Sequence, residues 1–329
     1  MSLRGRVLLC VGLTLGLLAV ALGYVIVAGR RGAAPAAPAG AVDLSAGERL
    51  LFRSTAQVSY GRVATVPRAA AAGPRVVSGL SCDRVYAAAG AGLCLRSDGP
   101  LATYQLAVLD SHLRIKDTYP LVGVPNRARV SPSGHVLAWT VFVTGDSYNG
   151  GKFSTRVGML DIATGETVDT LETYAVSRDG RAYRNVDLNF WGVTFVDDRH
   201  FYATMSTAGR RYLVYGDVAA QTVRTVAPNV ECPSLSPDRT RIAFKEAIGG
   251  DPGNGWRLTV LDLATLRRTP LAETRSVDDQ AAWLDDDTVM YAVRRGPKAS
   301  DVWAVPAAGG GAARLLIPDA ESPAALGNR

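Results

Sequence analysis

The chain has 329 residues, of which 47% are hydrophobic and 20% are charged, and its formal net charge is +6. Arginines at positions 4, 6, 30 and 31 account for most of the basic excess, because the rest of the chain carries 32 Lys and Arg against 30 Asp and Glu. Such a balance argues against a surface that neutralises nucleic-acid phosphates. We therefore expect no nucleic-acid partner.

An apolar segment follows the short basic start of the chain. Residues 1–6 form a cationic region, and residues 7–28 contain no charge. This second stretch is long enough to cross a hydrocarbon layer of about 30 Å as a helix. Ala19-Val20-Ala21 resembles a signal-peptidase site, but apolar sequence continues to Val27. Two interpretations stay open, an uncleaved transmembrane signal anchor and a cleaved signal peptide.

Residues 29–44 read as a linker, since the run GAAPAAPAGA at 32–41 is an Ala/Pro spacer that cannot bury a core. The prediction is a single-pass protein of the cell membrane, with residues 1–6 in the cytoplasm and the large domain on the extracytoplasmic side. If the segment is cleaved, the domain is secreted. Residues 42–329 suffice for one large all-β domain or two smaller ones.

A unit consisting of an apolar strand that ends in Asp or Pro recurs along this domain. Its best copies are RVGMLDIATG at 156–165 and RLTVLDLAT at 257–265. Successive strand ends are separated by 43, 51, 56, 45 and 44 residues, so six repeats of about 48 residues fill the domain. The six strand ends are Pro67, Asp110, Asp161, Asp217, Asp262 and Pro306.

A second unit precedes the first in most repeats. It reads LSPDRTRIAF at 235–244 and VSPSGHVLAW at 130–139, with looser copies starting at Phe195, Trp283 and Leu80. Pro, Asp and Gly between two apolar runs predict a tight hairpin. Four short strands in 40–50 residues make one propeller blade, and blades stack because one alone cannot bury both faces. Residues 45–329 are therefore predicted to form an all-β, six-bladed β-propeller with four-stranded blades.

The ends of the domain complement each other. The tail ESPAAL at 321–326 matches ECPSL at 231–235, which begins an innermost strand, whereas ERLLFR at 48–53 reads as a second strand without its first. We expect the C-terminal strand to join the N-terminal blade. That pairing closes the ring and hides the edges that an open ring would expose.

The combined repeat resembles that of TolB-like six-bladed propellers. The strongest matches are Ser236-Pro237-Asp238 and Ser131-Pro132-Ser133-Gly134, and the fourth repeat departs from the pattern with Val196-Asp197-Asp198. This resemblance implies the propeller fold over residues 45–329. It does not transfer TolB's envelope partners, because TolB has an α/β domain before its propeller where this chain has only the anchor and linker.

Two cysteines flank a strand, a glycine turn and a second strand. Cys82 and Cys94 would then lie on neighbouring strands, where a disulfide is geometrically possible. The alternative is a pair of buried free thiols.

The longest insertions, at 144–154, 172–186 and 246–255, are all predicted at one end of the propeller, where function is usually carried. Aligning the inner strands on Leu235, with Val76 as the counterpart in the second blade, gathers acidic residues at this end. They could bind a cation, an amine or a basic peptide, or they could be hydrated carboxylates lining a wet channel. The residues assigned to this channel mouth are Glu231, Asp279, Glu321, Asn126, Arg127, Trp191 and Asp278.

No convincing catalytic constellation is present in the sequence, and no cofactor or metal is predicted. The favoured function is a monomeric propeller that binds or scaffolds a protein or other cell-envelope partner through its long loops, and not an enzyme. The alternative is a calcium-dependent propeller hydrolase or lactonase. It would require the oxygens of Glu231, Asp279, Glu321 and Asn126 to hold a divalent cation.

Overall fold

A computed structural model describes residue 5 and residues 12–21, 40–99, 103–143 and 154–327. The chain divides into two units, Met1–Pro38 and Ala39–Arg329. Residues 12–21 of the first unit are helical. No helix among the described residues is both long and apolar enough to span a bilayer. Much of the predicted membrane segment at 7–28 lies outside the described residues.

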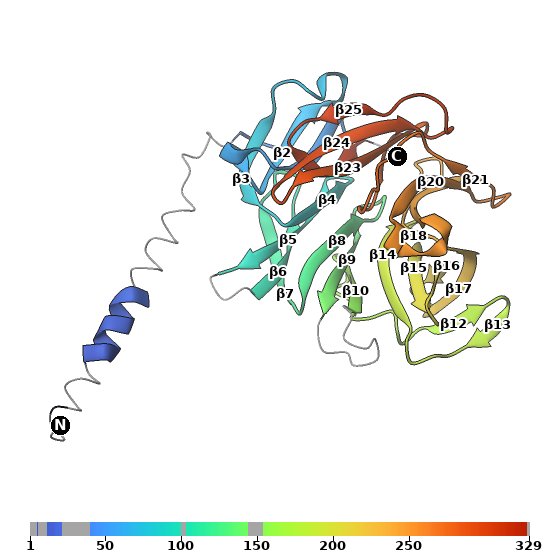
Figure 1. Cartoon of the computed structure of the whole chain (residues 1–329), viewed down its shortest axis with the longest axis horizontal. Helices are drawn as coiled ribbons and strands as arrows, with labels where there is room; N and C mark the ends of the chain where they lie inside the picture. Colours follow the sequence, from blue (N-terminus) through green and yellow to red (C-terminus); the bar gives the residue numbers. More distant parts are fainter. Residues whose placement is uncertain (1–4, 6–11, 22–39, 100–102, 144–153, 328–329) are drawn as a thin grey trace. The chain divides into compact units, whose positions relative to one another are not determined.

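Six sheets, named blades 1 to 6, form the second unit (Figure 1). Blade 1 consists of β26 (Ala320–Leu326), β1 (Arg49–Ser54), β2 (Arg62–Pro67) and β3 (Val76–Ser81). Blade 2 consists of β4 (Arg84–Ala88), β5 (Ala91–Asp98), β6 (Thr103–Leu109) and β7 (Ile115–Leu121). Blade 3 consists of β8 (Val124–Val130), β9 (Val136–Val143), β10 (Ser154–Asp161) and β11 (Thr167–Val168).

The remaining three blades follow in chain order. Blade 4 contains β14 (Asn189–Phe195), β15 (His200–Thr207), β16 (Arg210–Asp217) and β17 (Thr222–Pro228). Blade 5 contains β18 (Glu231–Leu235), β19 (Arg241–Ala247), β20 (Trp256–Asp262) and β21 (Arg268–Pro270). Blade 6 contains β22 (Ala282–Asp285), β23 (Thr288–Gly296), β24 (Ala299–Pro306) and β25 (Arg314–Ile317). The predicted six-bladed propeller is confirmed.

Blade 4 differs from the prediction of four strands in every blade. The insertion before β14, predicted as a long loop at 172–186, contains the hairpin β12 (Ala175–Arg178) and β13 (Arg181–Tyr183). β12 pairs in parallel with β17, so the sheet has six strands in the order β13-β12-β17-β16-β15-β14. The hairpin satisfies the backbone groups of an outer edge that would otherwise be open.

The recurring Asp marks the end of the third strand in a blade. β10, β16 and β20 end at Asp161, Asp217 and Asp262. The carboxylate of Asp161 accepts hydrogen bonds from the backbone N–H groups of Ala163 and Thr164, at 2.8 and 3.1 Å. An Asp at the start of a turn stabilises it in this way, which explains why the residue recurs with the blade.

The hairpin unit is placed correctly in blades 3 to 6 but incorrectly in blade 2. Ser131 and Ser236 follow β8 and β18, and each hydroxyl accepts a backbone hydrogen bond at 3.0 Å, from Val136 and Arg241 respectively. In contrast, Leu80 lies in β3, the outer strand of blade 1. The turn between the first two strands of blade 2 contains the dipeptide Ala89-Gly90, where both residues have positive φ.

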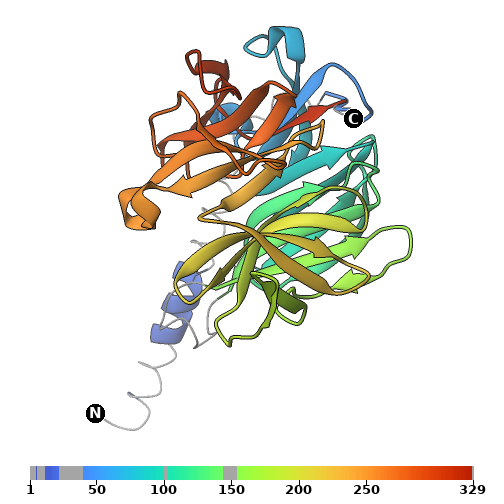
Figure 2. The ribbon, with the colours of Figure 1, turned by 90° about the vertical axis from the view of Figure 1, so that its right-hand side faces the viewer.

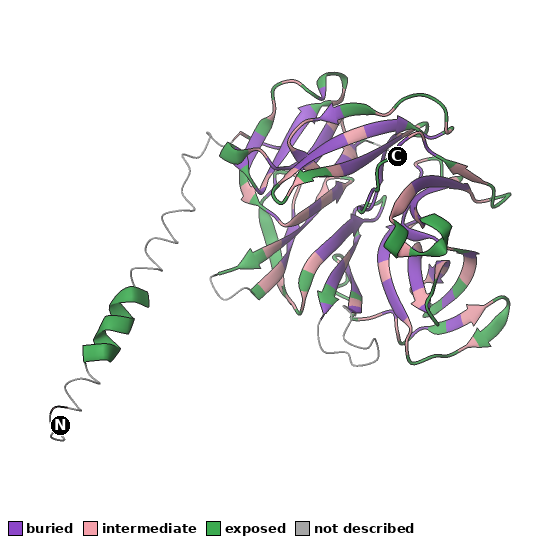
Figure 3. Cartoon of the chain, viewed as in Figure 1, coloured by how far each residue is buried: buried purple, intermediate pink, exposed green. Residues whose placement is uncertain are grey.

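The core lies between blades. Six clusters of buried apolar side chains occur in the described residues, and each combines strands of two neighbouring blades. Phe52 and Met290, for example, join blades 1 and 6 in one cluster. Figure 3 shows the buried residues along the middle of the strands and the exposed residues towards the loops and outer strands. Blade stacking is thus the main source of apolar burial.

Ring closure depends on the last strand. β26 pairs antiparallel with β1, with Ala324 opposite Leu51, both fully buried. Figure 2 shows this C-terminal strand beside the N-terminal strands of blade 1. The predicted closure is confirmed.

The longest link between strands of one described segment, 271–281 between β21 and β22, lies at one end of the ring, where two-residue links such as 297–298 also occur. This end, the long-loop face, carries the links between second and third strands and between blades, and it includes the 3-10 helices η1 (Gln57–Ser59), η4 (Ile248–Gly250) and η5 (Pro252–Asn254). The other end, the short-turn face, carries the remaining links, including η2 (Arg68–Ala70). The predicted loop at 144–154 falls almost entirely outside the described residues.

A disulfide joins Cys82, just before β4, to Cys94 in β5, with Cα atoms 5.5 Å apart. Both cysteines are buried in the cluster between blades 1 and 2. Cys232 is a buried free cysteine in β18.

Removing β26 should abolish cooperative folding of the propeller. A chain that stops after Asp319 loses the inner strand of blade 1 and exposes an edge of β1. A chain that stops after Gly327 keeps the whole strand and serves as the matched control. Thermal unfolding followed by near-UV circular dichroism should show a transition for the control alone. Equal transitions in both chains would disprove closure.

Candidate functional site

Two of the three predicted acids face a cation on the neighbouring strand of their own blade. Glu231 of β18 is opposite Lys245 of β19, and Glu321 of β26 is opposite Arg53 of β1. The Arg53 guanidinium lies 2.8 Å from the Glu321 carboxylate, and the Lys245 ammonium lies 3.7 Å from that of Glu231. Opposite charges directly across a pair of strands attract each other, so each acid has a partner within its own blade. Glu231 is also ion-paired with Arg211 of β16, in blade 4.

The third acid, Asp279, precedes β22 and is shared by two arginines of other blades. Its carboxylate lies 3.6 Å from the Arg127 guanidinium of β8 and 3.9 Å from that of Arg84 of β4. Asp279 and Arg127 are both buried. This cluster spans the channel, since it joins blades 2, 3 and 6.

Burial and the Lys245 charge shift the pKa values of Glu231 and Asp278 in opposite directions. Glu231 is only 5% exposed, and burial raises the pKa of its carboxyl although Lys245 and Arg211 oppose the shift. Asp278 has a side chain that is 72% exposed and lies 2.5 Å from the Lys245 ammonium. Burial works against its ionisation, but the charge and hydrogen bond of Lys245 prevail and lower the pKa of Asp278.

The other predicted residues are distributed along the same channel. The Asn126 side chain accepts a hydrogen bond from Arg127, and both residues are buried in β8. Trp191 lies in β14 and is partly exposed. Val76 is misassigned, because it belongs to the outer strand β3 and is 43% exposed. Arg84, at the start of β4, is the blade 2 residue that reaches the cluster.

Sequence reasoning missed the cationic half of this site. Arg53, Arg84 and Lys245 all pair with the predicted acids. A signal for two of them was present in the repeat, because Phe52-Arg53 and Phe244-Lys245 occupy the same place in the second strand of their blades. The contribution of Arg84 comes from another blade, and the repeat alone does not reveal it.

A cavity of about 230 Å³ opens beside the cluster on the long-loop face. It combines residues of blades 1, 2, 3 and 6, with basic and aromatic side chains prominent among them. They include Arg53, Tyr60, Arg84, Tyr104, Val124, Arg294, Lys298 and Glu321.

This geometry favours charged recognition over metal binding. Each of the three acids has at least one protein cation within 4.0 Å. The described residues contain no group of three or more His, Cys, Asp or Glu side chains placed to hold a metal ion. A divalent cation would have to compete with the guanidinium and ammonium groups already beside these carboxylates.

No family model matches the sequence, and no curated protein matches it. Solved structures share its fold. TolB from Acinetobacter baumannii superimposes with a TM-score of 0.58 at 15% identity, over 84% of this chain and 67% of that one. The putative TolB from Agrobacterium tumefaciens has a TM-score of 0.51 at 12% identity, over 83% and 90% of the chains. These identities establish the propeller fold alone.

Replacing Glu231 by Gln should change how stability depends on pH. Because its pKa is raised in the fold, the stability that Glu231 contributes is full below its ordinary pKa of 4.5 and is lost as pH rises through the folded value. Glutamine does not ionise. The unfolding free energy of wild type, measured relative to Glu231→Gln by urea titration, should therefore fall as pH rises above 4.5.

Glu166→Gln provides the control, because Glu166 is an exposed residue of a short-turn link. Its difference from wild type should show no comparable fall. A difference for Glu231→Gln that rises with pH would contradict the assignment.

Proposed function

Because the chain has the six-bladed propeller fold of the TolB proteins, we propose that it is a binding module that takes a protein partner on its long-loop face. The observation that supports this proposal is the cavity of about 230 Å³ on the long-loop face, in which charged and aromatic side chains from four blades converge. Long-loop ends of rigid scaffolds commonly carry recognition sites.

The rim of the cavity indicates the chemistry of the partner. Arg294 lies near the end of β23, and Lys298 lies in the two-residue link between β23 and β24. Both are exposed. Within the part of the chain that the structure describes, neither has an acidic group within 4.0 Å. Tyr60, which is 41% exposed, offers an aromatic surface beside them. A partner with an acidic patch around an apolar contact would complement this rim.

We further propose that the propeller is held outside the cytoplasm by its N-terminal segment. The uncharged stretch at 7–28 supports an anchor. The pairing of Cys82 with Cys94 supports an oxidising compartment. Fusion of alkaline phosphatase after Gly327 tests the orientation, because that enzyme is active only where its disulfides form. An inactive but intact fusion would contradict it.

Charge reversal at the rim tests the binding face. The tagged chain, the double variant Arg294→Glu/Lys298→Glu and a control variant Arg267→Glu are used as baits on solubilised membranes. Arg267 is exposed on the short-turn face, so its reversal alters net charge away from the rim. Quantitative mass spectrometry should find a protein that wild type and control retain, that high salt releases, and that the double variant loses by about tenfold.

The same protein recovered equally on all three baits would contradict the proposed face. If the protein were lost from the Arg267→Glu bait as well as from the double variant, the loss would reflect net charge alone. That result would also contradict the proposed face. The folded state of each bait is checked by its thermal transition.

A further inference from the structure

A second cavity, of about 100 Å³, occupies the opposite end of the channel. All six blades contribute to it, because Tyr86, Val130, Thr194, Leu235, Trp283 and Ala325 come from β4, β8, β14, β18, β22 and β26. Two further lining residues, Pro132 and Pro237, belong to the turns that follow β8 and β18. The cavity is therefore the short-turn mouth of the channel.

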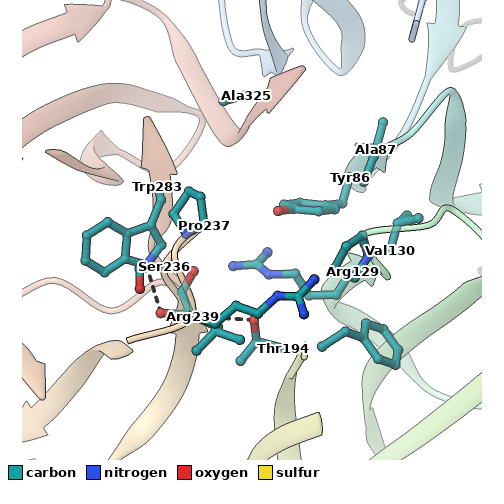
Figure 4. A pocket seen from close by; sticks show the side chains of 15 residues that line it. Tyr86, Ala87, Arg129, Val130, Thr194, Ser236, Pro237, Arg239, Trp283 and Ala325 are labelled. Carbon is teal, nitrogen blue, oxygen red and sulfur yellow. Dashed lines mark hydrogen bonds between the residues drawn. The ribbon is translucent and has the colours of Figure 1, made fainter. Parts of the chain in front are cut away.

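Among the described residues that line this cavity, the ionisable ones are two arginines and one tyrosine. Arg129 reaches it from β8, and Arg239 reaches it from the turn after β18. Figure 4 shows both side chains extending into the cavity from opposite sides, with the Tyr86 ring beside them. The lining contains no Asp or Glu. Asp238, which precedes Arg239, is hydrogen-bonded to Ser236 and lies 3.3 Å from Arg241.

Arg129 is a buried cation that is held by neutral groups. It is 7% exposed, and its guanidinium donates to the carbonyl oxygens of Ala281 at 2.6 Å and Ala128 at 3.1 Å. It also stacks over the Tyr86 ring, 4.5 Å from the centroid. No carboxylate within the described residues lies within 4.0 Å of it. Burial lowers the pKa of Arg129, as expected for a cation taken out of water.

Two guanidinium groups that extend into the same cavity repel each other unless an anion lies between them. The remaining walls limit which anion fits. They combine apolar residues, among them Phe195, Trp283 and two prolines, with the hydroxyl residues Thr194, Ser234 and Ser236. Apolar surface beside charged donors suits an acid that carries an apolar group better than a fully hydrated ion. We propose that this cavity binds the carboxylate of a small acid that carries an apolar or aromatic group. The guanidinium forks of Arg129 and Arg239 hold the carboxylate.

This site lies at the other end of the channel from the proposed protein-binding face. If no acid binds in this cavity, the proposed protein-binding function is unaffected. If an acid does bind, the protein-binding function is not thereby proved. The two ends are separated by the Asp279 cluster, whose cavity-lining residues include Arg84, Arg127 and Gln280.

Calorimetric titration of the full-length chain in mild detergent tests the proposal. The probes are 3-phenylpropionate, its uncharged amide and inorganic phosphate. The acid should bind saturably and more tightly than either of the other two probes. Arg239→Gln should weaken binding of the acid by about tenfold, because it removes one charged donor pair. Arg239 is exposed, so this change should leave the fold intact.

Arg267→Gln is the matched control, since it removes another exposed arginine from the same face, and it should bind the acid as wild type does. Absence of saturable binding, equal binding by Arg239→Gln, or binding of the amide as tight as that of the acid would each overturn the proposal. If phosphate bound more tightly than the acid, the cavity would be a site for a different anion, and this result would also overturn the proposal.

Discussion

The carboxylate of Asp279 compensates the buried positive charge at the centre of the ring. A propeller brings six inner strands together around a narrow axis, so side chains at that axis meet groups from blades that are far apart in sequence. Arg84 and Arg127 approach Asp279 from blades 2 and 3, at 3.9 and 3.6 Å. An unpaired guanidinium buried there would cost several kcal/mol. We therefore expect this shared acid to stabilise the arrangement of the inner strands.

Charge is distributed unequally along the channel. Towards the long-loop face, Glu321 and Glu231 are each paired with a cation of the adjacent strand, whereas Arg294 and Lys298 at the rim have no acid within 4.0 Å in the part of the chain that the structure describes. At the short-turn face, Arg129 and Arg239 line a cavity that contains no acid. One propeller thus presents a rim of mixed charge at one end and two cavity-lining arginines at the other.

Much of the fold follows from short-range patterns. The Ser-Pro turns and the Asp residues that end third strands each form their own local hydrogen bonds, so their spacing reports the blades directly. Closure was predictable because β26 repeats the start of β18. The hairpin of β12 and β13 carries a turn signal in Asp179-Gly180, where both residues have positive φ. Its attachment to the blade was not predictable, since β12 joins β17 by a parallel pairing that no turn motif marks. In blade 2, the dipeptide Ala89-Gly90 replaces the Ser-Pro turn, and the alignment shifted to Val76. The pairing of Asp279 with Arg84 and Arg127 arises from contacts between blades, which a repeat alignment cannot show.

The unfolding free energy of Asp279→Asn, compared with that of Asp117→Asn, tests most directly whether the channel acids serve to compensate buried arginines. Asp279 is buried, whereas Asp117 is exposed in β7 and has no cation within 4.0 Å among the described residues. Loss of the shared carboxylate should destabilise the protein by about 3–5 kcal/mol, and loss of the exposed one by less than about 1 kcal/mol. A neutral or stabilising effect of Asp279→Asn would show instead that the acids repel one another and would contradict the account.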